Sequence, residues 1–114
     1  MDSEFFEKYS DEPRLKEVIA DRLSIDFDIR AEVEGQFIVD GTSVFIDYLL
    51  FPKPALVEKG FVEDWVGLEV KHPKNGDNKP IKFAWQCITY SQSKFNNRRP
   101  PFVLMFPSIT FFLC

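Results

Sequence analysis

The sequence predicts a single mixed α/β domain in which a helix, three strands, a second helix and a further strand follow one another. Three observations lead to this prediction. Two segments have apolar residues at helical spacing, the stretch between them has a period of two, and a short apolar run after the second helix is typical of a buried strand. The 114 residues, 45% of them hydrophobic and 13 of them Phe, suffice for one core but not for two domains.

The first helix is expected from Asp11 to Leu23. Ser10 or Asp11 can cap it, and Pro13 is tolerated in its first turn. The apolar residues that recur at helical spacing along it are Leu15, Val18, Ile19 and Leu23.

Two strands are expected next, from Ala31 to Val39 and from Thr42 to Phe51, because the hydrophobic period becomes two. Between them lies Asp40-Gly41, a typical two-residue hairpin turn, so the strands should be adjacent and antiparallel. The segment from Pro52 to Asp64 contains two prolines and a glycine, which predicts a long connection.

A third strand is expected from Trp65 to Lys71, and it ends at His72-Pro73. After the polar turn of residues 73–78, a second helix is expected from about Pro80 to Phe95. This helix places several apolar residues on one face: Ile81, Ala84, Trp85, Ile88 and Phe95.

The second helix is expected to end before the segment from Asn96 to Pro101, which is followed by the C-terminal part of the chain. The run from Phe102 to Phe106 predicts a buried strand, and Ile109 to Leu113 is a candidate for another. The apolar segment from Phe102 to Cys114 ends without a polar finish, as expected of an abbreviated domain, a truncated chain or half of an obligate assembly. We therefore treat residues 1–114 as one domain, with truncation at the C-terminus as an open alternative.

Composition restricts the class of protein. The chain has no run of eighteen apolar residues and its first twenty residues are strongly charged, so neither a membrane span nor a secretory signal is expected. Cys87 and Cys114 lack the spacing of a zinc site, which predicts passive thiols in a reducing compartment. Motifs for nucleotide binding, zinc binding or acyl transfer are absent from the sequence. We expect a soluble cytoplasmic protein.

The charge of the chain excludes one kind of nucleic-acid binding. A net charge of −4 and a pI near 5.0 argue against a protein that coats nucleic acid by bulk electrostatics, because that mode needs an excess of Lys and Arg. They do not exclude a metal-dependent nuclease, whose carboxylates cluster around a cation. The basic residues also cluster in the second half of the chain: Lys71, His72, Lys74, Lys79, Lys82, Lys94, Arg98 and Arg99.

Asp47, Glu69 and Lys71 are charged residues near the ends of apolar strands, where burial alone would not require them. Asp47 alternates with apolar residues and so lies at the margin of a core, while Glu69 and Lys71 share one face of their strand. Two carboxylates on neighbouring strands can hold Mg²⁺, with the backbone carbonyl of Val70 as a further ligand. The alternative is a strand-end aspartate in solvent and a surface Glu/Lys pair of little energetic consequence.

These positions resemble the D…ExK site of the PD-(D/E)XK nuclease superfamily, from about Glu12 to Phe106. The stretch Trp85 to Ser91 is similar to the Q…Y helix of phage-type and VRR-NUC-like nucleases in this superfamily. The resemblance implies a restriction-endonuclease-like αβββαβ core with a mixed central sheet flanked by helices. It also implies Mg²⁺ (or Mn²⁺) as cofactor, DNA as partner, and the cytoplasm of a bacterium or phage-infected host as location.

The resemblance assigns roles to individual residues. Asp47 and Glu69 would bind metal, Lys71 would serve the attacking water, and Gln86 would position substrate. Further candidates are Val70 and Glu12 as metal ligands, and His72, Lys74 and Tyr90 as contacts to the substrate. Each has an alternative: Gln86 as an exposed helix residue with Gln92 as its rival, Glu12 as a helix-start residue, and His72 as a residue of the turn.

The expected function is therefore a metal-dependent nuclease that hydrolyses phosphodiester bonds in DNA. The alternative is a catalytically inactive module that keeps the nuclease fold and binds a protein or nucleic-acid partner, as the low pI and short length would allow. A homodimer with two sites is a further alternative.

Overall fold

The computed structural model describes residues 12–71 and 80–106, with only the backbone described for residues 80–84. The chain is mixed α/β, as predicted. The elements in order are α2 (Glu12–Leu23), β1 (Phe27–Phe37), β2 (Ser43–Pro52), α3 (Pro54–Glu58), β3 (Val66–Val70), α4 (Pro80–Ser91), β4 (Ser93–Lys94) and β5 (Val103–Phe106).

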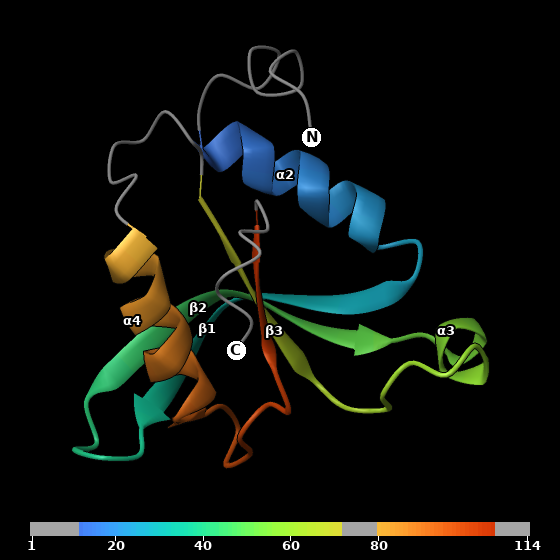
Figure 1. Ribbon diagram of the computed structural model, residues 1–114. Helices are drawn as coiled ribbons and strands as arrows, with labels where there is room; N and C mark the ends of the chain where they lie inside the picture. The colour runs from blue at the N-terminus through green and yellow to red at the C-terminus, as the bar shows by residue number, and fades with distance from the viewer. Residues whose placement is uncertain (1–11, 72–79, 107–114) are drawn as a thin grey trace.

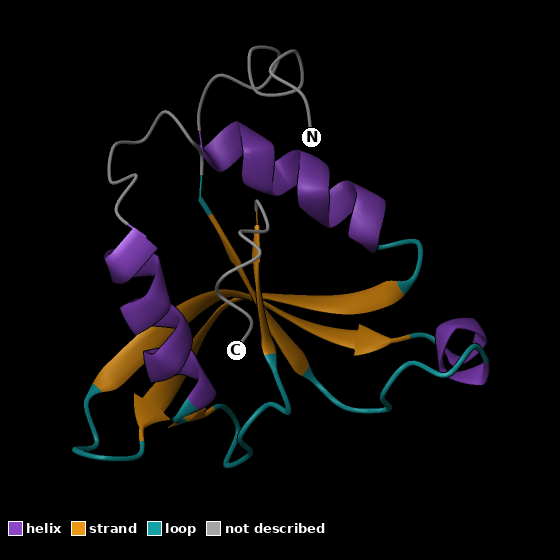
Figure 2. Cartoon of the chain, in the orientation of Figure 1, coloured by secondary structure: helices purple, strands orange, loops and turns teal. Residues whose placement is uncertain are grey.

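The strands form one mixed, curled sheet in the order β4-β1-β2-β3-β5, with α2 and α4 packed against different sides of it (Figure 1). β1 pairs antiparallel with β2 and β4, and β2 pairs antiparallel with β3. β5 runs parallel to β3, and the chain between them passes through α4 (Figure 2). β3, which lies between β2 and β5, is buried along its whole length.

The hairpin between β1 and β2 differs from the predicted two-residue turn. β1 ends at Phe37 rather than Val39, since the Phe37 N–H donates to the Thr42 carbonyl at 2.8 Å and the Gly41 N–H donates to the Phe37 carbonyl at 2.8 Å. In this part of the chain only Gly41 has a positive φ, of 75°, whereas a two-residue type I′ turn needs two such residues. Asp40 instead accepts a hydrogen bond from the Thr42 N–H at 2.9 Å.

The second helix is shorter than predicted. α4 ends at Ser91 rather than Phe95, because residues 93–94 pair with β1 as the short strand β4. The hydroxyls of Ser91 and Ser93 hydrogen-bond to carbonyls in the last turn of the helix. The connection after β2 contains a short helix that was not predicted, α3, with Pro54 at its start, a position where proline is favourable.

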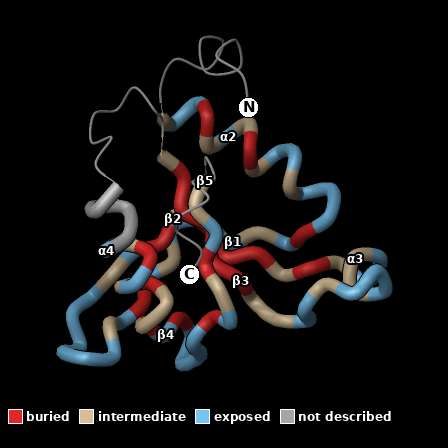
Figure 3. Tube along the Cα trace, viewed as in Figure 1, coloured by how far each residue is buried: buried red, intermediate tan, exposed pale blue. Residues whose placement is uncertain are grey.

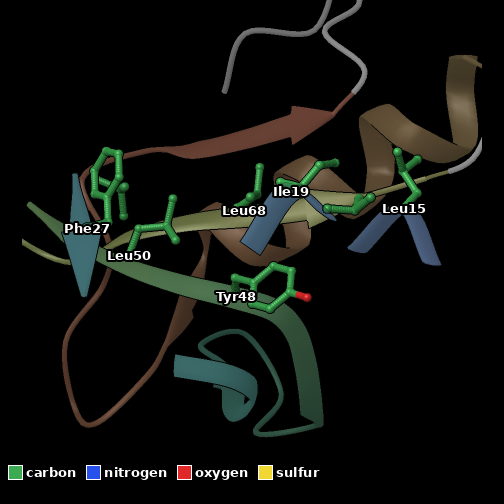
Figure 4. Close-up of a cluster of buried hydrophobic side chains, with 8 residues drawn as sticks. Leu15, Ile19, Phe27, Tyr48, Leu50 and Leu68 are labelled. Carbon is green, nitrogen blue, oxygen red and sulfur yellow. The ribbon is translucent and has the colours of Figure 1, made fainter. Parts of the chain in front are cut away.

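Two apolar clusters lie on the two faces of the sheet. Under α2, Leu15 and Ile19 pack with strand residues such as Tyr48, Leu50 and Leu68 (Figure 4). The second cluster, on the α4 side, consists of Ile46, Leu49, Tyr90, Phe95 and Val103. Residues 48 and 50 alternate with residue 49 along β2, as expected of opposite faces.

Three predictions about side chains in this region are wrong. Trp85 and Ile88 of α4 are 64% and 49% exposed, so the apolar face predicted for this helix is not the one that packs. Phe45 occupies a strand position, where a phenylalanine is most simply expected in the core, but it is 60% exposed. Cys87 is not a passive thiol, since it is buried and disulfide-bonded.

None of the helices in residues 12–71 and 80–106 is both long and apolar enough to span a membrane. Several predictions concern positions outside the described residues. These are the cap at Ser10 or Asp11, the substrate contacts His72 and Lys74, and the strand at Ile109 to Leu113.

Candidate functional site

Asp47 and Glu69 lie together at the point where the ladder between β2 and β3 ends. The last backbone pair is Tyr48 with Leu68. Beyond it the carboxylates replace the ladder bonds: the Asp47 N–H donates to Glu69 Oε1 at 3.1 Å, and the Val70 N–H donates to Asp47 Oδ2 at 2.7 Å. The two acids that the sequence places on neighbouring strands therefore contact each other's strand directly, and Val70 contributes its N–H.

Glu69 is the more buried of the two acids, with 4% of its surface exposed. Burial, together with the nearby charge of Asp47, raises the pKa of Glu69 to about 7. Tyr90 of α4 donates a hydrogen bond from its hydroxyl to Glu69 Oε2 at 3.0 Å, which opposes this rise. The pKa of Tyr90 is itself raised by burial and by the charge of Glu69, so its hydroxyl remains a donor at neutral pH.

Lys16 of α2 completes this network, and it was not among the predicted site residues. Its Nζ lies 2.7 Å from Asp47 Oδ1, with 29% of the lysine side chain exposed and 15% of the aspartate side chain. Burial lowers the pKa of Lys16, but the hydrogen bond and charge of Asp47 outweigh it, helped by the charges of Glu12 and Glu69, and the net pKa is raised. The ion pair joins α2 to the carboxylate pair.

The position of Lys16 follows from how α2 docks. Leu15 and Ile19 are buried against the sheet, and the Tyr48 hydroxyl donates to the Lys16 carbonyl at 3.1 Å. Lys16 follows Leu15 and therefore sits at the border of the apolar stripe, within reach of Asp47 in the middle of β2. The sequence feature that could have identified Lys16 is its position at this border, one helical turn after Glu12.

Lys71, the lysine predicted to serve the site, takes no part in this network. Its backbone N–H donates to the Phe106 carbonyl at 2.8 Å, which continues the pairing of β3 with β5. Its ammonium makes no hydrogen bond or ion pair with any residue that the structure describes, and the side chain is half-buried. Lys71 is thus close to the carboxylates along the chain but independent of them.

Gln86 lies on α4 one turn before Tyr90 and is half-buried, so the exposed alternative does not apply to it. Its Oε1 is buried and accepts no hydrogen bond within the described part of the chain. Such an atom is unfavourable unless water or a ligand supplies a donor. Its rival Gln92 is half-buried at the end of α4, where its backbone carbonyl accepts a hydrogen bond from Ile38 at 2.9 Å.

Glu12 is the first residue of α2, and its Oε1 is buried. Its charge acts on Lys16, which places it on the same side of the site. Within the described residues, however, no group of three or more His, Cys, Asp or Glu side chains is arranged to hold a metal ion. Any cation at this site would therefore use the two carboxylates of Asp47 and Glu69.

Glu32 of β1 marks a distortion beside the site. Its φ is 50°, and the β1–β2 pairing skips from Ala31–Tyr48 to Val33–Ile46, so Glu32 faces Asp47 without pairing with it. A left-handed conformation costs a non-glycine residue about 1–2 kcal/mol. The strained residue therefore lies opposite Asp47 of β2, and no sequence pattern predicted this strain.

No protein-family model, curated protein or solved structure matches this chain.

Proposed function

We propose that this protein is a metal-dependent nuclease of the PD-(D/E)XK type that hydrolyses phosphodiester bonds in DNA, with Mg²⁺ or Mn²⁺ held by Asp47 and Glu69. The observation that carries the proposal is the carboxylate pair at the end of the β2–β3 ladder, in which Glu69 is buried and Asp47 is half-buried. Asp47 and Glu69 repel each other when both are charged, and this repulsion destabilises the folded protein. The raised pKa of Glu69 reflects both its burial and this repulsion. Residues whose pKa is shifted by burial and by a neighbouring charge are frequent at functional sites.

The residues present fit a Mg²⁺ ion. Magnesium keeps several waters and is usually bound through one or two carboxylates rather than an all-protein cage. A divalent cation would offset the repulsion between Asp47 and Glu69. The buried Gln86 Oε1 offers an acceptor for a water or a substrate hydroxyl. When bound, the cation would lower the pKa of a water and offset negative charge on the phosphate.

Other residues of the protein would hold the two metal-binding carboxylates in position. The Tyr90 hydroxyl and the Asp47 N–H fix the two oxygens of Glu69, and the Val70 N–H fixes one oxygen of Asp47. Lys71 has an ammonium that no described residue engages, so it is available to contact a phosphate or the attacking water. In this proposal the αβββαβ elements form a restriction-endonuclease-like core around the site.

A second function, a catalytically inactive module of this fold that binds a partner, is favoured by a different observation. All four oxygens of Asp47 and Glu69 already accept hydrogen bonds from the protein. In this alternative the pair is structural and replaces the missing ladder bonds between β2 and β3. Such a protein need not bind Mg²⁺ or Mn²⁺ detectably.

The experiment that tests the proposal is cleavage of labelled single-stranded, duplex, flap and four-way-junction DNA with Mg²⁺, Mn²⁺ or EDTA. We expect cutting that depends on the metal and is lost in Asp47→Asn and Lys71→Ala. Asp28→Asn, an exposed aspartate of β1, is the matched control and should cut normally. If the folded protein cuts none of these substrates, or if Asp47→Asn cuts as well as wild type, the proposal is wrong.

A further inference from the structure

The Lys16 ammonium occupies the position where a cation would approach Asp47. Its Nζ is 2.7 Å from Asp47 Oδ1, and the charges of Glu12 and Glu69 act on it as well. A positive charge this close to a carboxylate repels a divalent cation that binds the same oxygen. One of the two cations must therefore yield when the other binds.

The lysine is able to yield without disturbing the fold. The helix around it is held by Leu15 and Ile19 in the core and by the hydrogen bond from the Tyr48 hydroxyl to the Lys16 carbonyl. None of these contacts involves the ammonium. Because 29% of the side chain is exposed, the flexible four-carbon stem can carry the charge into water.

We propose that Lys16 is an internal counter-cation of the carboxylate pair, which neutralises Asp47 in the metal-free protein and withdraws when a divalent cation binds. This inference rests on the proposed function, because it requires a metal site at Asp47 and Glu69. It adds regulation of that site: the charge of Lys16 lowers the affinity for metal and keeps the site stable without it. Cation binding is thereby coupled to the position of the Lys16 side chain on α2.

The test is calorimetric titration of Mn²⁺ into the wild-type protein and into Lys16→Met, Lys16→Arg and Lys59→Met. Lys16→Met should bind Mn²⁺ about tenfold more tightly or better, because the ion no longer has to displace the ammonium from Asp47. Lys16→Arg keeps the charge and should stay near wild type. Lys59→Met changes the net charge equally at an exposed position and should also behave as wild type.

The outcomes separate this inference from the proposed function. Equal or weaker binding by Lys16→Met, with binding lost in Asp47→Asn, would overturn the role of Lys16 and leave the metal site standing. If no protein of the series binds Mn²⁺, both proposals are wrong.

A second measurement keeps the inference testable should Lys16→Met not fold. In wild-type protein with ¹⁵N-labelled lysine, the hydrogen-bonded Lys16 ammonium should give a protected NMR signal that Mg²⁺ abolishes. A Lys16 signal that persists unchanged at saturating Mg²⁺ would contradict the inference.

Discussion

The face of the sheet under α2 and the face under α4 each have a cluster of buried residues, but the two faces are held in different ways. Buried residues, red in Figure 3, lie along the strands and on both helices. Under α2, Leu15 and Ile19 pack on apolar strand side chains. On the α4 side, Tyr90 belongs to the apolar cluster but also donates a hydrogen bond to a buried carboxylate, Glu69. The packing of Leu15 and Ile19 involves no titratable group, whereas the second face keeps an acid that is unfavourable to bury. The stability that comes from the apolar contacts under α2 should therefore not depend on pH, while the stability that comes from the α4 face should.

The largest effect is expected at the acid that joins the two faces. Asp47→Asn should lower the catalytic efficiency of metal-dependent DNA cleavage by about a hundredfold or more, because a metal ligand and the partner of Lys16 are lost. Steady-state kinetics on the best substrate measures this effect, and circular dichroism checks the fold. Full activity in a folded Asp47→Asn would mean that the hydrogen bonds of Asp47 and Glu69 serve the fold and not the cleavage reaction.

The α2 face should show a large loss of stability that does not depend on pH. Leu15→Ala removes a fully buried side chain and should lower the free energy of unfolding by about 2–5 kcal/mol. Urea denaturation at pH 5 and pH 8 should give the same loss. A loss that differed clearly between the two values would mean that the two faces do not act independently.

On the opposite face, Glu69→Gln should stabilise the protein, and only at high pH. The pKa of Glu69 is raised from 4.5 to about 7 on folding, so below pH 4.5 the group is protonated in both states and costs nothing. Between pH 4.5 and 7 the folded protein keeps a proton that the unfolded chain releases, so the penalty grows across this range and is complete above pH 7, at roughly 3 kcal/mol. Glutamine removes this penalty.

Denaturant unfolding of Glu69→Gln and wild type between pH 4.5 and pH 8.5 measures this effect. Glu34→Gln, an exposed glutamate of β1, is the control and should leave the pH profile unchanged. A Glu69→Gln variant that is less stable than wild type at pH 8 would show that the carboxylate is favourable in the folded state.

Tyr90→Phe should have a smaller effect of the opposite sign. It removes the hydroxyl that donates to Glu69, so the pKa of Glu69 should rise further and the protein should lose about 1–3 kcal/mol at pH 8. The loss should shrink at pH 5, where Glu69 is protonated. Thermal unfolding at both pH values measures it, and an equal loss at each would indicate a packing effect alone.

The smallest effect is expected at Trp85, on the exposed side of α4. Trp85→Ala should change the free energy of unfolding by no more than about 0.5 kcal/mol, because 64% of the side chain is exposed. The same denaturant titration measures it. A loss of about 3 kcal/mol or more would mean that Trp85 faces the core, as the sequence pattern predicted.

The sequence predicts the α2 face of the sheet better than the α4 face. The helix α2 and the strands β1, β2, β3 and β5 follow from the apolar pattern, and this signal also placed Asp47 and Glu69 on neighbouring strands, whereas β4 was predicted as part of the second helix. Periodicity failed for α4, because its packed face contains Tyr90, whose hydroxyl donates to the buried Glu69, while Trp85 and Ile88 are exposed. Hydrophobicity alone cannot identify a helix face selected by hydrogen bonding.

The site itself was only partly predictable. Asp47 interrupts the apolar pattern of β2, Glu69 lies near the end of β3, and Tyr90 lies one turn after Gln86 on α4, so their sequence positions indicated them. Lys16 reaches Asp47 from 31 positions away in the sequence, and its contact depends on the crossing angle of α2, which no local pattern encodes. The choice between Lys16 and Lys71 therefore required the structure.

The most direct test of the account is an NMR titration of the Glu69 side-chain carboxyl in ¹³C-labelled protein, with and without Mg²⁺. Without metal, we predict that Glu69 titrates near pH 7 because it is buried beside Asp47. With saturating Mg²⁺, its pKa should fall clearly, since a bound cation favours the charged carboxylate. A carboxyl that titrates near 4.5 in the metal-free protein, or one whose pKa Mg²⁺ leaves unchanged, would contradict the assignment of this pair as a metal site.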